Sequence, residues 1–95
     1  MNFRVAAMEI HLYAPWVHSL KEKRMIVKSL LGKIRNRYAV SAAETGAQDV
    51  HQTIVIGIAA IAAHNAQADS MMDDILAFVE SSTEAEIISI DREIR

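Results

Sequence analysis

The stretch His-Gln-Thr-Ile-Val-Ile-Gly-Ile-Ala-Ala-Ile-Ala-Ala, residues 51–63, decides the fold of this chain. It is rich in Ile and Val and is apolar on both faces of an extended backbone. That composition predicts a strand buried in the middle of a sheet. A polar turn at 46–50 and a second extended segment at 38–45 precede it. The other elements are therefore expected to be arranged around this central strand.

Two further strands are predicted near the ends of the chain. Residues 3–13 alternate between an apolar side, which includes Ile10, and an outer side, which includes Glu9 and His11. A period of two is the signature of a strand with one buried face. Residues 86–93 carry three isoleucines and form the last predicted strand.

Two amphipathic helices are predicted between the strands. Apolar side chains recur at helical spacing over about 20–37, where Ser19 and Glu22 have the spacing of a capping box. Gly32 lies inside this helix and weakens it slightly. The second helix is expected to begin at Asn65, as its N-cap, and to end near Ser82. Met residues in this helix fit its buried stripe.

The order βαββαβ predicts an α+β fold, the ferredoxin-like sandwich, with both helices on one face of a four-stranded antiparallel sheet. Ninety-five residues are expected to form a single domain over 1–95. Glu9 and His11 would then point from the open sheet face. Because 52% of the residues are hydrophobic, a high share for this size, we expect this face to be covered by a second copy in a homodimer.

Composition excludes several classes of protein. The chain has no Cys, so it contains neither a disulfide framework nor thiolate chemistry. Its first residues lack the order of a signal peptide, and the apolar stretch 54–63 is far shorter than the roughly 20 residues that span a bilayer. We therefore expect a cytoplasmic protein without a membrane association.

Positive charge is concentrated in one segment. Residues 21–37 contain seven of the ten Lys and Arg residues and one acidic residue, a net charge of +6, whereas the rest of the chain carries −8. A clustered positive field attracts phosphate or acidic partners whatever the overall charge. The first helix is therefore the leading candidate for a binding element.

The basic residues of this helix fall on different sides of it. Lys21, Arg24, Lys28 and Arg35 share a strip beside the apolar stripe, Lys23 and Arg37 lie on the opposite flank, and Lys33 faces away. The candidate RNA- or phosphate-binding residues are Lys21, Lys23, Arg24, Lys28, Arg35 and, as a stacking group, Trp16. The alternative is that acidic residues of the second helix pair with these cations: Asp69, Asp73, Asp74 and Glu80.

No pattern in the chain supports catalysis or a cofactor. Possible metal ligands are His11, His51, His64, Glu9, Glu44 and Asp49, but their spacing matches no known metal site. A polar role at an interface is favoured for Glu9 and His11. The segment 44–52 is predicted to be a turn that Asp49 and Gln52 close through side-chain to backbone bonds, with a contact role as the alternative. We expect no enzyme, no metal and no cofactor.

Several short motifs carry a resemblance to a known family. Ser19-Leu20-Lys21-Glu22-Lys23-Arg24 is followed by Ala43-Glu44, Gln48-Asp49, Gln52, Ile56-Gly57-Ile58-Ala59 and Phe78-Val79-Glu80. This set resembles the DUF503 or YlxP-like family of small bacterial proteins. The resemblance implies the same sandwich fold and no assigned activity. It also implies a role near translation, because family genes often sit near that of ribosome-binding factor A. Thr45-Gly46-Ala47 stands where more charge is expected from the family.

Two functions follow from these observations. The first is a non-enzymatic protein that is associated with RNA or the ribosome. In this function the first helix would contact rRNA or a ribosomal subunit, and no DNA specificity is expected. The alternative is a dimeric regulatory or partner-binding module with a ligand or protein site at the sheet-mediated interface, near Glu9 and His11.

Overall fold

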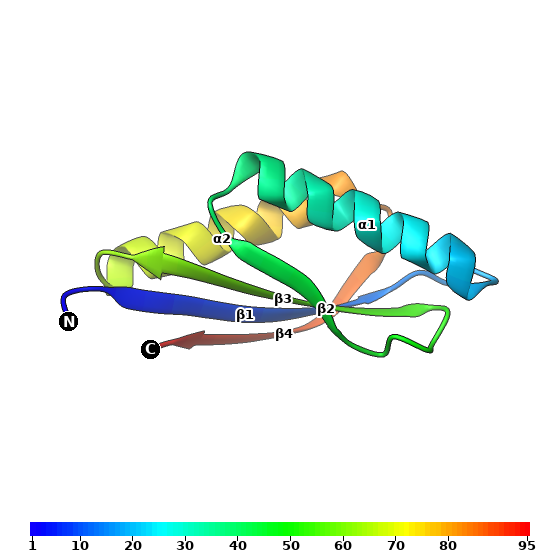
Figure 1. The fold of residues 1–95 in the computed structure, drawn as a ribbon, viewed down its shortest axis with the longest axis horizontal. Helices are drawn as coiled ribbons and strands as arrows, with labels where there is room; N and C mark the ends of the chain where they lie inside the picture. The colour runs from blue at the N-terminus through cyan, green and yellow to red at the C-terminus, as the bar shows by residue number, and fades with distance from the viewer.

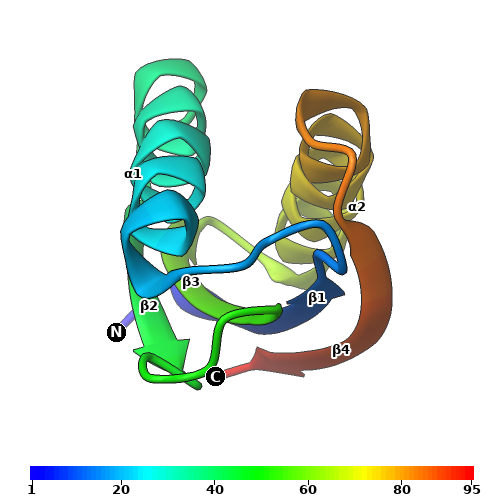
Figure 2. The same ribbon diagram turned by 90° about the vertical axis from the view of Figure 1, so that its right-hand side faces the viewer.

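The computed structural model describes residues 1–95 as six elements along the chain. These are β1 (Arg4–Tyr13), α1 (Leu20–Arg37), β2 (Ser41–Gly46), β3 (Thr53–Ala62), α2 (Asn65–Ser82) and β4 (Glu86–Ile94). The strands form one antiparallel sheet in the order β2-β3-β1-β4, and both helices lie on the same face of it (Figures 1 and 2). The predicted ferredoxin-like α+β fold is confirmed, and β3 lies inside the sheet.

The hydrophobic core fills the layer between the helices and the sheet. It is one cluster of 21 buried residues drawn from both helices, from β1, β2 and β3, and from connecting segments, and Ile87 and Ile94 of β4 pack against it. Ile10 of β1 and Ile56 of β3 are register partners at its centre, and both are 0% exposed. Burial of each such side chain stabilises the fold by about 1.5–3 kcal/mol. Alternation along β1 and β3 therefore fixes which sheet face receives the helices.

The predicted element boundaries need two corrections. The N-cap of α2 is His64, not Asn65, because His64 keeps an extended backbone and its Nδ1 accepts from the Gln67 N–H at 3.2 Å. The second strand begins at Ser41 rather than at 38. Tyr38 caps the C-terminus of α1, and its ring packs edge-on against Phe78 of α2 with centroids 5.6 Å apart. Packing between the helices thus holds residue 38 out of the sheet.

The other sheet face is not covered by a helix and carries small and polar side chains together with a few larger apolar ones. Glu9 and His11 lie on this face, as predicted. A shallow groove of about 780 Å³ runs across it, and small residues such as Ala7, Gly57 and Ala59 line its floor. Ile61 near the end of β3 is 70% exposed.

Neither helix combines the length and the hydropathy that a membrane-spanning helix requires.

Candidate nucleic-acid interface

The basic strip of α1, defined as Lys21, Arg24, Lys28 and Arg35, lies on the flank of the helix that faces away from α2. All four residues are exposed. The Arg35 guanidinium donates to the Ala42 carbonyl of β2, which places the strip on the β2 side of the helix. Lys33 and Arg37, by contrast, reach Ser82 and the Phe78 ring of α2. Figure 2 shows α1 above β2, with α2 over the other side of the sheet.

Acidic residues of α2 do not neutralise the basic strip. Asp69 and Asp73 pair instead with Arg92 of β4, at 3.5 and 2.6 Å. The Asp74 carboxylate accepts a hydrogen bond of 2.7 Å from the Tyr38 hydroxyl. This bond and partial burial raise the pKa of Tyr38, burial being the larger cause. The strip is therefore open, and the alternative of pairing between the helices does not apply to it.

Lys23 differs from the other cations because it is 1% exposed. Its ammonium donates to the carbonyl of Ala47 and lies 3.1 Å from Oε2 of Glu44 in β2. Ala47 has a φ of 52°, in the left-handed region that is uncommon for residues other than glycine. Lys23 thus ties α1 to the β2–β3 turn. This corrects its place among the candidate phosphate contacts, since no surface of the side chain is left for a phosphate.

Arg35 makes a hydrogen bond within the chain, as Lys23 does, but remains exposed, as the other residues of the strip are. One guanidinium nitrogen bonds the Ala42 carbonyl of β2, which is an edge strand of the sheet. A cation over an edge strand hinders pairing with a foreign strand. Because guanidinium has five N–H donors and Arg35 remains exposed, the side chain keeps donors for a further partner. Lys21, Arg24 and Lys28 have no hydrogen bond or ion pair within the chain.

Trp16 lies in the loop that leads into α1, where 40% of its surface is exposed. Gln52 holds this loop, since its amide donates to the carbonyls of Pro15 at 2.9 Å and Val17 at 3.4 Å. Its backbone carbonyl also accepts from the Ala14 N–H at 2.8 Å. The prediction that the Gln52 side chain closes its own turn is therefore wrong. A Val50 to Ala47 backbone bond of 3.0 Å closes the turn.

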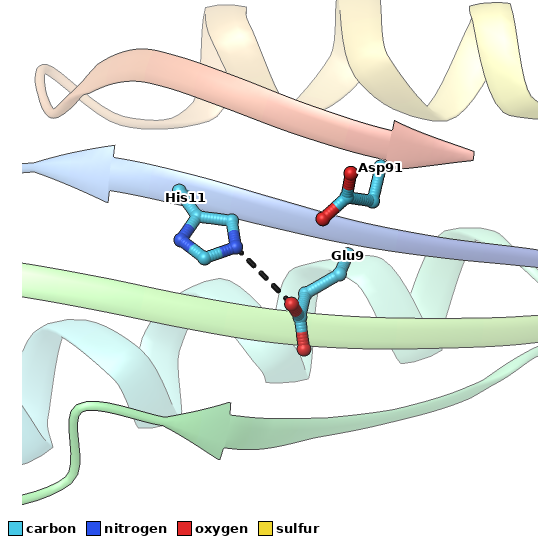
Figure 3. Close-up of side chains that lie close together, drawn as sticks. All are labelled: Glu9, His11 and Asp91. Atoms are coloured by element: carbon cyan, nitrogen blue, oxygen red, sulfur yellow. Dashed lines mark hydrogen bonds and ion pairs between the residues drawn. The ribbon is translucent and has the colours of Figure 1, made fainter.

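A second cluster of polar residues lies on the open sheet face. Glu9, His11 and Asp91 each place one possible metal-ligand atom within 4.8 Å of the others (Figure 3). His11 Nε2 is 3.1 Å from Glu9 Oε1, and the Thr45 hydroxyl donates to Glu9 Oε2 at 2.9 Å. The Thr45 bond, followed by the His11 contact, lowers the pKa of Glu9. This residue set could hold a divalent cation by one imidazole nitrogen and two carboxylate oxygens.

The sequence prediction found only part of this cluster. Asp91 joins it because β4 pairs with β1 in a register that sets Asp91 opposite Glu9. A sequence pattern without strand pairing carries no signal for that neighbour. Two of the other suggested ligands have different partners: Glu44 pairs with Lys23, and His64 caps α2. His51 and Asp49 lie in the β2–β3 turn, outside the cluster.

The basic strip and the groove differ in charge. The strip carries four cations on the helical layer, whereas three carboxylates, Glu9, Asp91 and Glu93, line the groove on the open sheet face together with one cation, Arg92. A polyanion is attracted to the first surface and repelled by the second. Outward residues in the middle of β1 and β3 include no aromatic side chain, so the sheet also lacks the base-stacking platform of RNA-recognition motifs. Any nucleic-acid contact is therefore expected on α1.

Comparison with known proteins places the chain among its relatives. The family model described as "Protein of unknown function (DUF503)" matches residues 5–92. The chain belongs to the DUF503 family. It is also 40% identical over 68 residues to the uncharacterized protein YlxP of Bacillus subtilis (strain 168), a match that covers 72% of this chain and 74% of that protein.

In this DUF503 protein, the motif residues that carried the resemblance hold the structure together. Ser19 caps α1 by accepting from the Glu22 N–H at 3.1 Å. Lys23 pairs with Glu44, and Gln52 holds the β1–α1 loop. Lys21 and Arg24, from the same six-residue motif, make no such bonds and are exposed. The motif thus contains both residues with a role in the fold and residues that are free to bind.

Proposed function

We propose that this DUF503 protein is a non-enzymatic RNA-binding protein that associates with ribosomal RNA through the basic strip of α1. The observation that carries the proposal is the set of exposed cations without an intramolecular partner, namely Lys21, Arg24 and Lys28. Retaining three such cations on one flank, in a chain whose net charge is −2, favours a polyanionic partner. The gene neighbourhood implied by the family resemblance favours ribosomal RNA within that class.

The basic strip is long enough to follow the sugar–phosphate backbone of an RNA. From residue 21 to residue 35 the helix rises about 21 Å, at roughly 1.5 Å per residue. Contacts along such a length go mainly to phosphates, so they position a partner without reading its sequence. Trp16 lies beyond the N-terminal end of α1 and supplies a stacking surface for an unpaired base. The proposed partner is therefore a structured RNA that carries an exposed unpaired nucleotide.

Reversing two charges of the strip tests the proposal. The variant Arg24→Glu/Lys28→Glu should stay folded, because both side chains are exposed and unpaired. The slope of log K against log salt for binding a structured RNA should decrease in magnitude by about two, because each lost phosphate contact removes about one. Arg35 is left intact because it also bonds Ala42.

The matched control is Arg4→Glu/Lys33→Glu, which changes the net charge equally at two exposed residues away from the strip. This control should retain most of the wild-type affinity. Equal losses in both variants would show that net charge, and not the strip, governs binding.

A second candidate function is the dimeric module with its site on the open sheet face. The groove of about 780 Å³ and the exposed Ile61 favour it, because this face has no cover within the chain. Sedimentation equilibrium at micromolar concentrations tests the dimer. If the wild type already sediments as a monomer, or if the Ile61→Lys variant still sediments as a dimer, the open face is not a dimer interface.

A further inference from the structure

Gly32 occupies a position in α1 that the chain itself does not explain. It lies in the helix interior, where glycine destabilises a helix relative to alanine. No glycine in the chain has a positive φ, so the backbone does not require glycine here. Beyond its chain neighbours and the backbone of its own helix, a Cβ built on Gly32 would meet no atom within 4 Å, so packing does not require glycine either. The missing side chain leaves the helix backbone open to approach from outside.

The surroundings of Gly32 on the helix surface are polar and basic. Residues three and four positions away on a helix are surface neighbours, which here are Lys28, Ser29, Arg35 and Asn36. All four are exposed, and none is acidic. Two cations and two side chains with hydrogen-bonding capacity thus surround a notch without a side chain, between Lys28 and Arg35 of the basic strip.

We propose that Gly32 is the point at which the sugar–phosphate backbone of a bound RNA comes closest to α1. Lys28 and Arg35 contact phosphates on either side of the notch, and Ser29 and Asn36 supply hydrogen bonds to phosphate or ribose oxygens. Glycine permits this approach because any larger side chain would hold the RNA away from the two cations. This inference rests on the proposed function and adds a steric requirement to it.

Charge complementarity favours RNA over a neutral or basic protein surface as the occupant. The strip contains four cations, and the helix contributes one acidic residue, Glu22, about a quarter turn away from Lys21. A neutral or basic protein surface would leave these cations unpaired at the contact. A closely approaching phosphate backbone compensates them at short distance, where Coulomb attraction is largest.

The variant Gly32→Gln tests the proposal. Glutamine adds no charge and is a better helix former than glycine, so the melting temperature should equal or exceed that of the wild type. Its side chain should hold the RNA away from Lys28 and Arg35 and weaken binding to a structured RNA by about tenfold. Gly32→Ala, which adds one methyl group, should raise the melting temperature and weaken binding by less than about twofold.

The control places the same side chain on the other helix. Ala77→Gln adds a glutamine at an exposed position of α2 and should bind RNA as the wild type does. Wild-type affinity in Gly32→Gln, or an equal loss in Ala77→Gln, would overturn the notch as a contact point. The proposed function is judged separately, because Arg24→Glu/Lys28→Glu leaves Gly32 in place. If the wild type binds no RNA at low salt, both the proposed function and the notch fail.

Discussion

Replacing Lys23 by methionine is expected to destabilise the fold by about 3 kcal/mol, which is the lower end of the range for breaking a buried ion pair. Methionine retains most of the volume of the lysine stem but leaves the Glu44 carboxylate without its cation. Oε2 of Glu44 is buried and accepts no hydrogen bond, so it depends on the ammonium 3.1 Å away. The Ala47 carbonyl also loses its donor. Because Glu44 is 19% exposed, water offsets part of the loss.

The neighbouring residue supplies the control. Arg24 is exposed and unpaired, so Arg24→Met should change the free energy of unfolding by less than about 0.5 kcal/mol. Urea denaturation of both variants gives the comparison. The double variant Lys23→Met/Glu44→Leu should cost less than the sum of its single changes by at least about 1 kcal/mol. Strict additivity would show that the pair contributes no interaction energy.

Replacing Ile34 by alanine is expected to cost about 3–4 kcal/mol, because the side chain is 0% exposed and its removal leaves a cavity under α1. Met25 lies on the same helix and is 66% exposed, so Met25→Ala should be neutral to within about 0.5 kcal/mol. Thermal and urea unfolding of the two variants report which side of α1 faces the sheet. A large cost for Met25→Ala would mean that the helix is rotated and that the basic strip is not exposed.

Periodicity predicted the fold well because β1 and the two helices each have one clearly apolar face. The helix predicted over about 20–37 is observed at Leu20–Arg37, where the Ser19 cap and the buried stripe through Ile34 agree. The strand at 51–63 is observed at Thr53–Ala62 inside the sheet, since its apolar residues face both ways. Local propensity and core burial favour the same structure in these segments, so little depends on tertiary context.

The candidate site was predicted less completely, since it depends on contacts between distant segments. Charge and helical spacing placed Lys21, Arg24, Lys28 and Arg35 on one strip, and the structure shows that this strip is open. The burial of Lys23 could not be predicted, because it arises from the close approach of Glu44 and the turn carbonyl of Ala47. The same holds for Asp91, which strand pairing brings beside Glu9. Sequence spacing alone contains none of these distances.

The central claim is tested most directly by the salt dependence of binding. Binding to purified ribosomal subunits is compared with binding to a generic structured RNA at matched ionic strength. Four phosphate contacts from the basic strip predict a slope of log K against log salt of about −3, with tighter binding to one subunit than to the generic RNA. In Arg24→Glu/Lys28→Glu the slope should fall to about −1. No binding at low salt, or the same slope in the wild type and the variant, would contradict an RNA contact through α1.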